Sequence, residues 1–284
     1  MRDLRVGAVC MRSETGKISK NIEKTSFYVS KASKAGADVI CFPELSITGY
    51  TLLEPSRVWE DLDQDAVMES ILRMARENNV VILAGLVERS DKAGPWISHI
   101  VAGPRGLLGI YRKTHLSPPE SGRYEAGQDL TVFSSDLAVF GIQLCYETHF
   151  PELSTVMALR GVEVLFLPHA SPRGRPAEKL ESWQRHIPGR AFDNGFFVIA
   201  CNQAGTNKEG LSFPAVAMAL GPDGRVLETY KGKGEGLMLV DLKSSVLDEV
   251  RNHRMRYFLP HRRPQLYREV SSSASHRARF TDHE

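Results

Sequence analysis

The sequence has little cysteine, and this argues against two classes of protein, those held together by disulfides and those built around a zinc ribbon. Four cysteines, at positions 10, 41, 145 and 201, are spread over 284 residues, and no Cys-x-x-Cys pair is present. Neither a disulfide framework nor a zinc ribbon is therefore predicted. Cys145 and His149 could share a metal only with further ligands, and no second pair of ligands is evident. We expect no metal and no cofactor.

The net charge is small, and long apolar runs are absent from the sequence. The chain has 36 Lys and Arg against 34 Asp and Glu, a formal charge of +2, which gives no reason to expect nucleic acid or an anionic membrane as a partner. No run approaches the roughly 18 apolar residues of a membrane span, and the first residues lack the apolar core of a signal peptide. These features favour a cytoplasmic protein with small-molecule partners.

The most informative stretch that is present runs from residue 141 to 153. An apolar run from Leu137 to Leu144 predicts a buried strand, and helical spacing begins after Pro151, so Cys145 falls on the turn between them. A side chain on such a turn points out of the sheet, next to backbone N–H groups that can receive an oxyanion. The pattern therefore indicates a nucleophile. The alternative is a buried structural thiol.

Strands and helices alternate along the rest of the chain. Apolar faces predict helices over 18–32, which should stop at Gly36, and over 67–75. A third helix opens at Pro176, and Pro188 should kink or end it because proline removes one backbone hydrogen bond. Short apolar runs predict strands at 6–9, 39–42, 80–86, 97–101, 107–111, 164–167, 196–201, 215–220, 226–230 and 237–240.

The chain contains an internal sequence similarity, which we call the internal echo. Residues 36–46 align without gaps on residues 161–171, and Gly49 then falls on Gly174. This indicates two similar β-α-β halves, packed sheet to sheet with helices outside. Glu44 and His169 would then lie at equivalent strand ends and face a shared cleft. Chance similarity between two buried strands is the alternative.

Three stretches together resemble the signature blocks of the carbon-nitrogen hydrolase (nitrilase) superfamily. They are Phe42-Pro43-Glu44-Leu45 with Thr48-Gly49-Tyr50, Tyr111-Arg112-Lys113-Thr114-His115-Leu116, and Cys145-Tyr146-Glu147 with Phe150-Pro151-Glu152. The resemblance continues through 189–194 and 262–267, so it covers nearly the whole chain. It implies a four-layer α-β-β-α sandwich over residues 1–270, followed by a polar tail over 271–284. It also implies a homodimer or larger homo-oligomer, to which the Arg-rich stretch 251–268 could contribute.

The resemblance assigns a Glu-Lys-Cys triad to Glu44, Lys113 and Cys145, each of which is a weak signal alone. The chemistry suits these residue types, because a thiol needs a nearby base or cation to react at neutral pH. Glu44 would take the proton of the thiol. Lys113 and the backbone N–H of Tyr146 would stabilise the oxyanion. The resemblance also suggests that Glu120, seven residues after Lys113, hydrogen-bonds the lysine and helps to position substrate, unless it is an exposed loop carboxylate.

Tyr50, Tyr146 and His169 complete the candidate substrate-binding residues. His149 stands where many relatives carry an arginine that pairs with a substrate carboxylate, and imidazole cannot reproduce that bidentate pairing. N-carbamoyl amino acids are therefore a disfavoured substrate class, and we expect His149 to be a structural hydrogen-bond donor. Arg173 and Arg175 could line the mouth of the pocket or be solvated loop charges.

The predicted function is hydrolysis of the C–N bond of a small non-peptide amide through a thioester, which releases ammonia or an amine. Nitrile hydrolysis is the first alternative, although family nitrilases often have Trp where this chain has Tyr146. N-carbamoyl amide cleavage is the next. Acyl transfer to an amine and a non-catalytic binding role are the remaining alternatives, because fold alone does not secure function.

Overall fold

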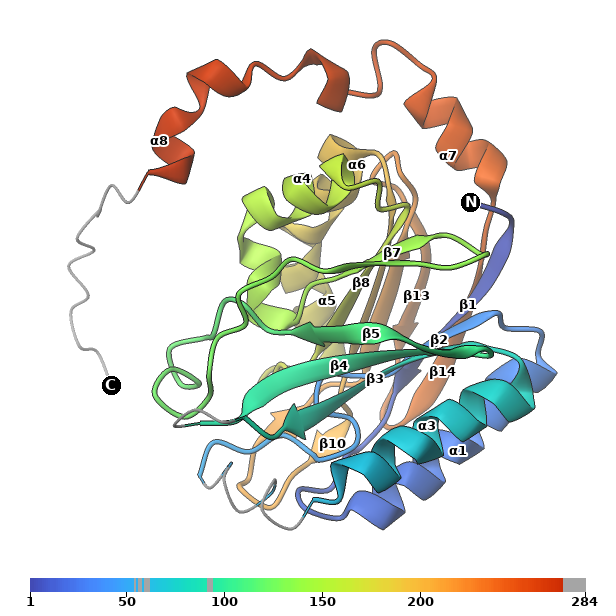
Figure 1. Ribbon diagram of the computed structural model, residues 1–284, viewed down its shortest axis with the longest axis vertical. Helices are drawn as coiled ribbons and strands as arrows, with labels where there is room; N and C mark the ends of the chain where they lie inside the picture. The colour runs from blue at the N-terminus through green and yellow to red at the C-terminus, as the bar shows by residue number, and fades with distance from the viewer. Residues whose placement is uncertain (54, 56–57, 59–61, 91–93, 273–284) are drawn as a thin grey trace.

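The computed structural model describes residues 1–272 except 54, 56–57, 59–61 and 91–93. Two six-stranded mixed sheets pack against each other (Figure 1). In spatial order, the first sheet contains β14 (Gly236–Leu242), β1 (Leu4–Cys10), β2 (Val39–Cys41), β3 (Val81–Glu88), β4 (Trp96–Gly103) and β5 (Gly106–Arg112). The second contains β13 (Val226–Lys231), β12 (Val216–Leu220), β9 (Phe197–Asn202), β8 (Val164–His169), β7 (Val139–Ile142) and β6 (Val132–Ser134). A two-stranded ladder pairs β10 (Gly205–Thr206) with β11 (Ser212–Phe213).

Helices cover the outer face of each sheet. On the first sheet lie α1 (Ile18–Lys34) and α3 (Gln64–Asn78), which run side by side in Figure 1. Against the second sheet lie α4 (Pro151–Leu159), α5 (Pro176–Gln184) and α6 (Ile187–Asn194). The order of layers is helix, sheet, sheet, helix, so the predicted α-β-β-α sandwich is confirmed. Among the described residues, no helix combines the length and the apolar character needed to cross a membrane.

The sequence pattern explains the layers. Strands β3, β8 and β9 are buried along their whole length, as expected where one face meets the opposite sheet and the other meets helices. Helix α3 buries a single stripe that includes Val67, Ile71 and Met74. Asp63 caps its first turn by accepting a hydrogen bond from the backbone N–H of Ala66 at 2.9 Å.

The internal echo corresponds to a structural repeat. Strands β1, β2 and β3 are parallel neighbours in the first sheet, as β7, β8 and β9 are in the second. Gly36 and Gly161 follow helices α1 and α4 with φ of +80° and +89°, the left-handed conformation that ends a helix and that glycine adopts without strain. Gly49 and Gly174, at the second echo position, also have positive φ. The two predicted β-α-β halves are thus confirmed.

The structure refines two local predictions. The apolar run from Leu137 to Leu144 forms only the short strand β7, after which the backbone turns into the 3-10 helix that begins at Cys145. The predicted helix from Pro176 breaks before Pro188, and α6 begins at Ile187 with Pro188 in its first turn. Proline costs little there, because the N–H groups of a first turn have no partner within the helix. Of the two predicted outcomes, a kink or an end of the helix, the structure shows the end, and the proline then lies in the first turn of the next helix.

The last described segment forms an arm. Helix α7 (Ser244–Arg251) is held to the body by Arg251, whose guanidinium donates to the carbonyls of Gly195 at 2.9 Å and Val162 at 2.6 Å. Beyond it, η2 (Leu259–His261), η3 (Pro264–Leu266) and α8 (Arg268–Ser271) arch away from the sandwich (Figure 1). Over residues 252–272, Leu259 alone is buried. Most of the predicted polar tail, from 273 onward, lies outside the described residues.

Candidate active site

Glu44 lies three residues beyond the end of β2, and its side chain is completely buried. Its two oxygens have different partners. Oε2 accepts a hydrogen bond from the backbone N–H of Ala170 at 3.0 Å, and Oε1 accepts one from Nζ of Lys113 at 2.8 Å. The carbonyl of Glu44 accepts a further hydrogen bond, from the side-chain amide of Gln203, at 2.8 Å. Residues from both sheets therefore fix the position of this carboxylate.

Lys113 follows β5 and is also fully buried. Its Nζ lies between two carboxylates, 2.8 Å from an oxygen of Glu44 and 2.8 Å from an oxygen of Glu120. Glu120 is positioned in turn by the hydroxyl of Tyr50 at 3.2 Å and by the backbone N–H of Ser117 at 2.8 Å. Pairing of this kind keeps a buried ammonium charged. Because an ammonium has three N–H donors, one can still serve a further acceptor.

Cys145 begins the 3-10 helix η1 (Cys145–His149) with a φ of +47°, a strained value for a residue with a side chain. Cys145 as a residue keeps some contact with solvent, whereas Cys10, Cys41 and Cys201 are buried. No described group accepts a hydrogen bond from the N–H of Tyr146, as expected in a first helical turn. The arrangement thus offers a free N–H directly beside the sulfur.

Burial and neighbouring charges set the protonation states in this cluster. Burial raises the pKa of Glu44 to about 7, with opposition from Lys113 and reinforcement from Glu120. Burial and then the charge of Glu44 raise the pKa of the Cys145 thiol well above its ordinary value. Burial opposes the charge on Lys113, but Glu44 and Glu120 outweigh it and raise the lysine pKa. At neutral pH the cluster therefore holds a thiol, an ammonium and a carboxyl group poised to take a proton.

Glu147 was not predicted as a functional residue, although the Cys-Tyr-Glu block contains it. Its buried carboxylate joins the two loops that carry Cys145 and Lys113. One oxygen accepts the N–H of Leu144 at 2.6 Å; the other accepts the hydroxyl of Tyr111 at 2.8 Å, the N–H and hydroxyl of Thr114 at 2.8 and 2.6 Å, and the N–H of His115 at 3.4 Å. The signal that could have found it is an acidic residue two positions after a nucleophile, in a chain segment otherwise typical of the core.

The remaining candidates have other surroundings. His169 is buried, with Nδ1 2.8 Å from the carbonyl of Leu167 and its ring packed on Trp183 at 4.5 Å between centroids. Burial lowers its pKa to about 3, so the ring is neutral. Arg175 is exposed and pairs with Glu178 at 2.5 Å, which matches a solvated loop charge.

His149 is exposed and stacks on His186, with ring centroids 4.5 Å apart. It makes no hydrogen bond within the described residues, so the expected donor role is not what the structure shows.

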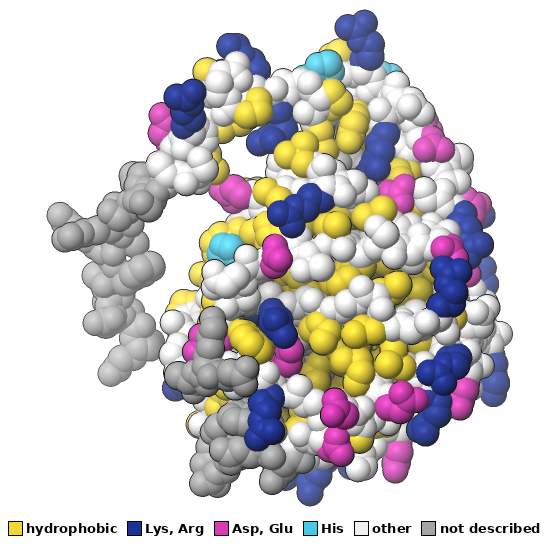
Figure 2. Space-filling model, in the orientation of Figure 1, with side chains coloured by type: hydrophobic (Ala, Val, Ile, Leu, Met, Phe, Trp, Pro, Cys, Tyr) yellow, Lys and Arg dark blue, Asp and Glu magenta, His cyan; other side chains and the backbone are white. Residues whose placement is uncertain are grey.

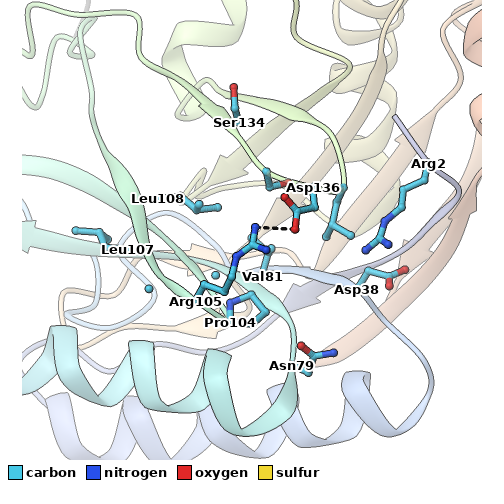
Figure 3. A pocket seen from close by; sticks show the side chains of 14 residues that line it. Arg2, Asp38, Asn79, Val81, Pro104, Arg105, Leu107, Leu108, Ser134 and Asp136 are labelled. Carbon is cyan, nitrogen blue, oxygen red and sulfur yellow. Dashed lines mark hydrogen bonds and ion pairs between the residues drawn. The ribbon is translucent and has the colours of Figure 1, made fainter.

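A cavity of about 570 Å³ lies at the opposite ends of the strands (Figure 3). It is lined by the β4–β5 hairpin around Arg105 and by Arg2, Asp38 and Asp136. Arg105 and Asp136 pair across it at 2.6 Å. Strand β5 begins beside this cavity and ends at Arg112, next to Lys113, so the cavity and the Glu44–Lys113 cluster are at different ends of the sandwich. In the described parts of the chain, no three His, Cys, Asp or Glu side chains are grouped to hold a metal ion.

Comparison with known proteins decides the family. The model of the carbon-nitrogen hydrolase family matches residues 5–252. The chain belongs to this family. A nitrilase of Pyrococcus abyssi is 27% identical over 269 residues, which span 93% of this chain and 99% of the relative. A 2-oxoglutaramate amidase of Bacillus subtilis is 31% identical over 239 residues, 83% of this chain and 89% of its own length.

Solved structures agree on the fold. An amidase from Nesterenkonia sp. has a TM-score of 0.80 at 23% identity and covers 94% of this chain and 96% of its own. The predicted family and fold are thus confirmed. As a carbon-nitrogen hydrolase, the protein is an enzyme that acts on non-peptide C–N bonds, and amidase names predominate among its relatives.

Proposed function

We propose that this carbon-nitrogen hydrolase is an amidase in which Cys145 is the nucleophile, Glu44 the general acid and base, and Lys113 the oxyanion donor. One observation carries most of the proposal: a buried ammonium is held 2.8 Å from Glu44, and the charges of both groups act on the thiol of Cys145, the one cysteine that is not fully buried. Burial of such a cluster costs free energy, because each charge loses its hydration and depends on its partners for compensation. Nucleophilic catalysis gives a reason for its presence.

In the first step, Sγ of Cys145 attacks the amide carbon while Glu44 accepts the thiol proton. The raised pKa of Glu44, about 7, suits this transfer. The carbonyl oxygen becomes an oxyanion, which takes the third N–H of Lys113 and the free N–H of Tyr146. The loss of one such donor typically costs about 3 kcal/mol in barrier height.

In the second step, the carboxylic acid form of Glu44 gives its proton to the nitrogen of the collapsing intermediate. The C–N bond breaks, ammonia or an amine leaves, and the acyl group stays on Cys145 as a thioester. Glu44 then removes a proton from water, which attacks the thioester carbon. The sulfur departs and recovers its proton through Glu44, so the carboxylic acid product and the starting thiol are restored. Glu120 holds Lys113 in place throughout.

Two observations favour amides over nitriles as substrates. Four relatives are named as amidases, whereas two, from Schizosaccharomyces pombe and Pyrococcus abyssi, are named as a probable nitrilase and a nitrilase. Tyr146 also occupies the position after the nucleophile where family nitrilases often have Trp. Its ring packs edge-on against Phe150 at 5.5 Å and His149 at 5.8 Å. We therefore propose amide hydrolysis, with nitrile hydrolysis and N-carbamoyl cleavage as outcomes that a substrate panel would separate.

The test is release of ammonia from small amides, nitriles and N-carbamoyl compounds. We expect turnover of amides, and Cys145→Ala should abolish it. Cys10→Ala is the matched control, because this cysteine is buried away from the cluster and its loss should leave turnover intact. Added hydroxylamine or methylamine would reveal acyl transfer by its products. Turnover that survives in Cys145→Ala, or turnover of nitriles alone, would contradict the proposal.

We further propose that the protein is a homodimer or larger homo-oligomer, assembled through the C-terminal arm. Figure 2 shows hydrophobic side chains along the arm and on the body beside it. The arm exposes Met255, Phe258, Leu266, Tyr267 and Val270, a cost in water that a second copy would relieve. Sedimentation velocity should show a dimer or larger species. A Leu266→Glu, Val270→Glu double variant should shift it towards monomer, and a monomeric wild-type protein would refute the idea.

We also propose a cytoplasmic location. All four cysteines lie in the described residues as free thiols, and a free nucleophilic thiol is best preserved in a reducing compartment. Cell fractionation that finds the protein in an oxidising compartment would contradict this.

A further inference from the structure

Lys179, on α5, is a second cation close to the site. Its Nζ donates to the hydroxyl of Ser171 at 2.8 Å and to the carbonyl of Pro172 at 3.0 Å. Both acceptors are uncharged. Lys113 has two carboxylate partners and Arg175 has one, but no carboxylate pairs with Lys179 in the described part of the chain. Since its side chain is partly buried, Lys179 is an ammonium without a counter-ion and with incomplete access to water.

The segment that holds this ammonium is continuous with the site. Ser171 directly follows Ala170, whose N–H binds the carboxylate of Glu44 at 3.0 Å. The buried side chain of Asn202 clamps Ser171 on both sides, accepting from its N–H at 2.8 Å and donating to its carbonyl at 3.0 Å. Burial lowers the pKa of Lys179, whereas a thiolate at Cys145 would raise it, so the two side chains are close enough to interact. The ammonium is therefore held by a fixed piece of backbone beside the reacting groups.

We propose that Lys179 binds a carboxylate of the substrate, so that the preferred substrates are amides with an acid group at the other end of the molecule. This rests on the amidase function proposed above. Two of the three N–H groups of Lys179 are used within the protein, so the third is available to a ligand. A charge-assisted hydrogen bond in a partly water-excluded place discriminates strongly between a carboxylate and a neutral group. The same ammonium repels amides that carry a cation.

The location of Lys179 relative to the triad separates it from other cations on this surface. Arg173 is exposed, and Arg175 is exposed and neutralised by Glu178 at 2.5 Å. In the described residues, neither guanidinium donates a hydrogen bond to Ser171 or Pro172, the acceptors of Lys179 next to Ala170. Arg175 precedes the first residue of α5, close in sequence to Lys179, and so it provides a matched control for the loss of a positive charge from this region.

The experiment compares amides of equal size that differ in charge. Succinamate and glutaramate carry a carboxylate, and butyramide and valeramide carry a methyl group in its place. For the wild-type enzyme we expect kcat/KM to be at least about ten-fold higher for the acids. Lys179→Met should lower kcat/KM for the acids by about ten- to a hundred-fold, mainly through KM, and leave the neutral amides nearly unchanged. Lys179→Arg should retain most of the preference, and Arg175→Met should behave as wild type.

Binding without turnover separates this inference from the proposed function. Calorimetry should show that succinamate binds Cys145→Ala protein, and that adding Lys179→Met weakens binding at least about ten-fold. If neutral and acidic amides are hydrolysed equally well, or if Lys179→Met slows both equally, the carboxylate role is wrong although the amidase function stands. If no amide is hydrolysed but the calorimetric difference is found, the proposed function fails and the carboxylate site stands. Equal binding by both variants would overturn the site itself.

Discussion

Replacement of Glu147 by glutamine tests whether one buried carboxylate aligns the two loops of the site. Glu147→Gln keeps the shape of the side chain and removes its charge and one acceptor. The carboxylate accepts from Leu144, which precedes Cys145, and from Thr114, which follows Lys113. Each of these contacts is 2.8 Å or shorter. The substitution therefore acts on the position of both the nucleophile and the lysine without touching either.

The expected magnitude follows from the geometry. Every partner of Glu147 in the structure is a donor, so the new NH₂ group must face a donor and leave at least one buried N–H or O–H unpaired. That costs about 1–3 kcal/mol. The other hydrogen bonds lose the strengthening that an ionised acceptor gives. We expect a total loss of about 2–4 kcal/mol in the free energy of unfolding. A displacement of the reacting groups approaching 1 Å would lower kcat about a hundred-fold.

Two measurements check this prediction: urea unfolding for stability, and kcat on an amide at a temperature where the variant is fully folded. The matched control is Glu163→Gln. Glu163 accepts from the N–H of Val139 at 2.9 Å and from the chain's first amino group at 2.5 Å, at the start of β7 and away from the triad. The control should lose stability but keep kcat. A folded Glu147→Gln enzyme with wild-type kcat would refute the proposed alignment.

Two further predictions concern the acid limb and the loop after Glu44. Glu44 must be ionised to act as a base and its pKa is about 7, so kcat/KM should fall as the pH drops below that value. The charge of Glu120 raises this pKa. Glu120→Gln should therefore move the acid limb of the pH profile of kcat/KM to lower pH, and it should also slow turnover. An acid limb that stays or moves up would contradict this. Gly49→Ala should lower the free energy of unfolding by more than about 2 kcal/mol, because φ is +76° and a Cβ would lie 2.6 Å from the backbone of Thr15. Gly174→Ala should lower it by only about 1 kcal/mol, because its Cβ would meet only a side chain, at 3.4 Å. Thermal unfolding of the two variants measures the difference, and equal losses of stability would contradict the prediction.

Local signals were enough to predict the layers of the fold. Runs of apolar residues mark the strands, and glycines mark the helix ends, so the repeat of residues 36–46 in 161–171 could be recognised from the sequence. The pairing of β14 with β1 could not be predicted. It joins residues more than 200 positions apart, such as Leu4 and Leu242, and no local pattern encodes that partner.

The candidate site divides in the same way. Glu44, Lys113 and Cys145 each lie in a recognisable motif, and the family resemblance joins the three motifs. Glu147 and Lys179 have roles that depend on contacts with distant segments or on the conformation of a loop. From sequence alone, Lys179 could equally be a solvated charge on a helix face, because its position beside the site depends on the conformation of the loop 171–176. The apolar surface of the C-terminal arm could not be predicted either, because exposed apolar side chains can be recognised only once the chain is folded.

The proposed mechanism requires the acyl group of the amide to pass through Cys145. Rapid acid quench of the wild-type enzyme mixed with a lesser amount of amide, followed by mass spectrometry of the intact protein and its peptides, tests it directly. We expect a transient gain of one acyl group, confined to the peptide that contains Cys145, which appears with released ammonia and decays as free acid forms. Consumption of the amide with no acylated protein at any time, or acylation of Cys10, Cys41 or Cys201 instead, would contradict it.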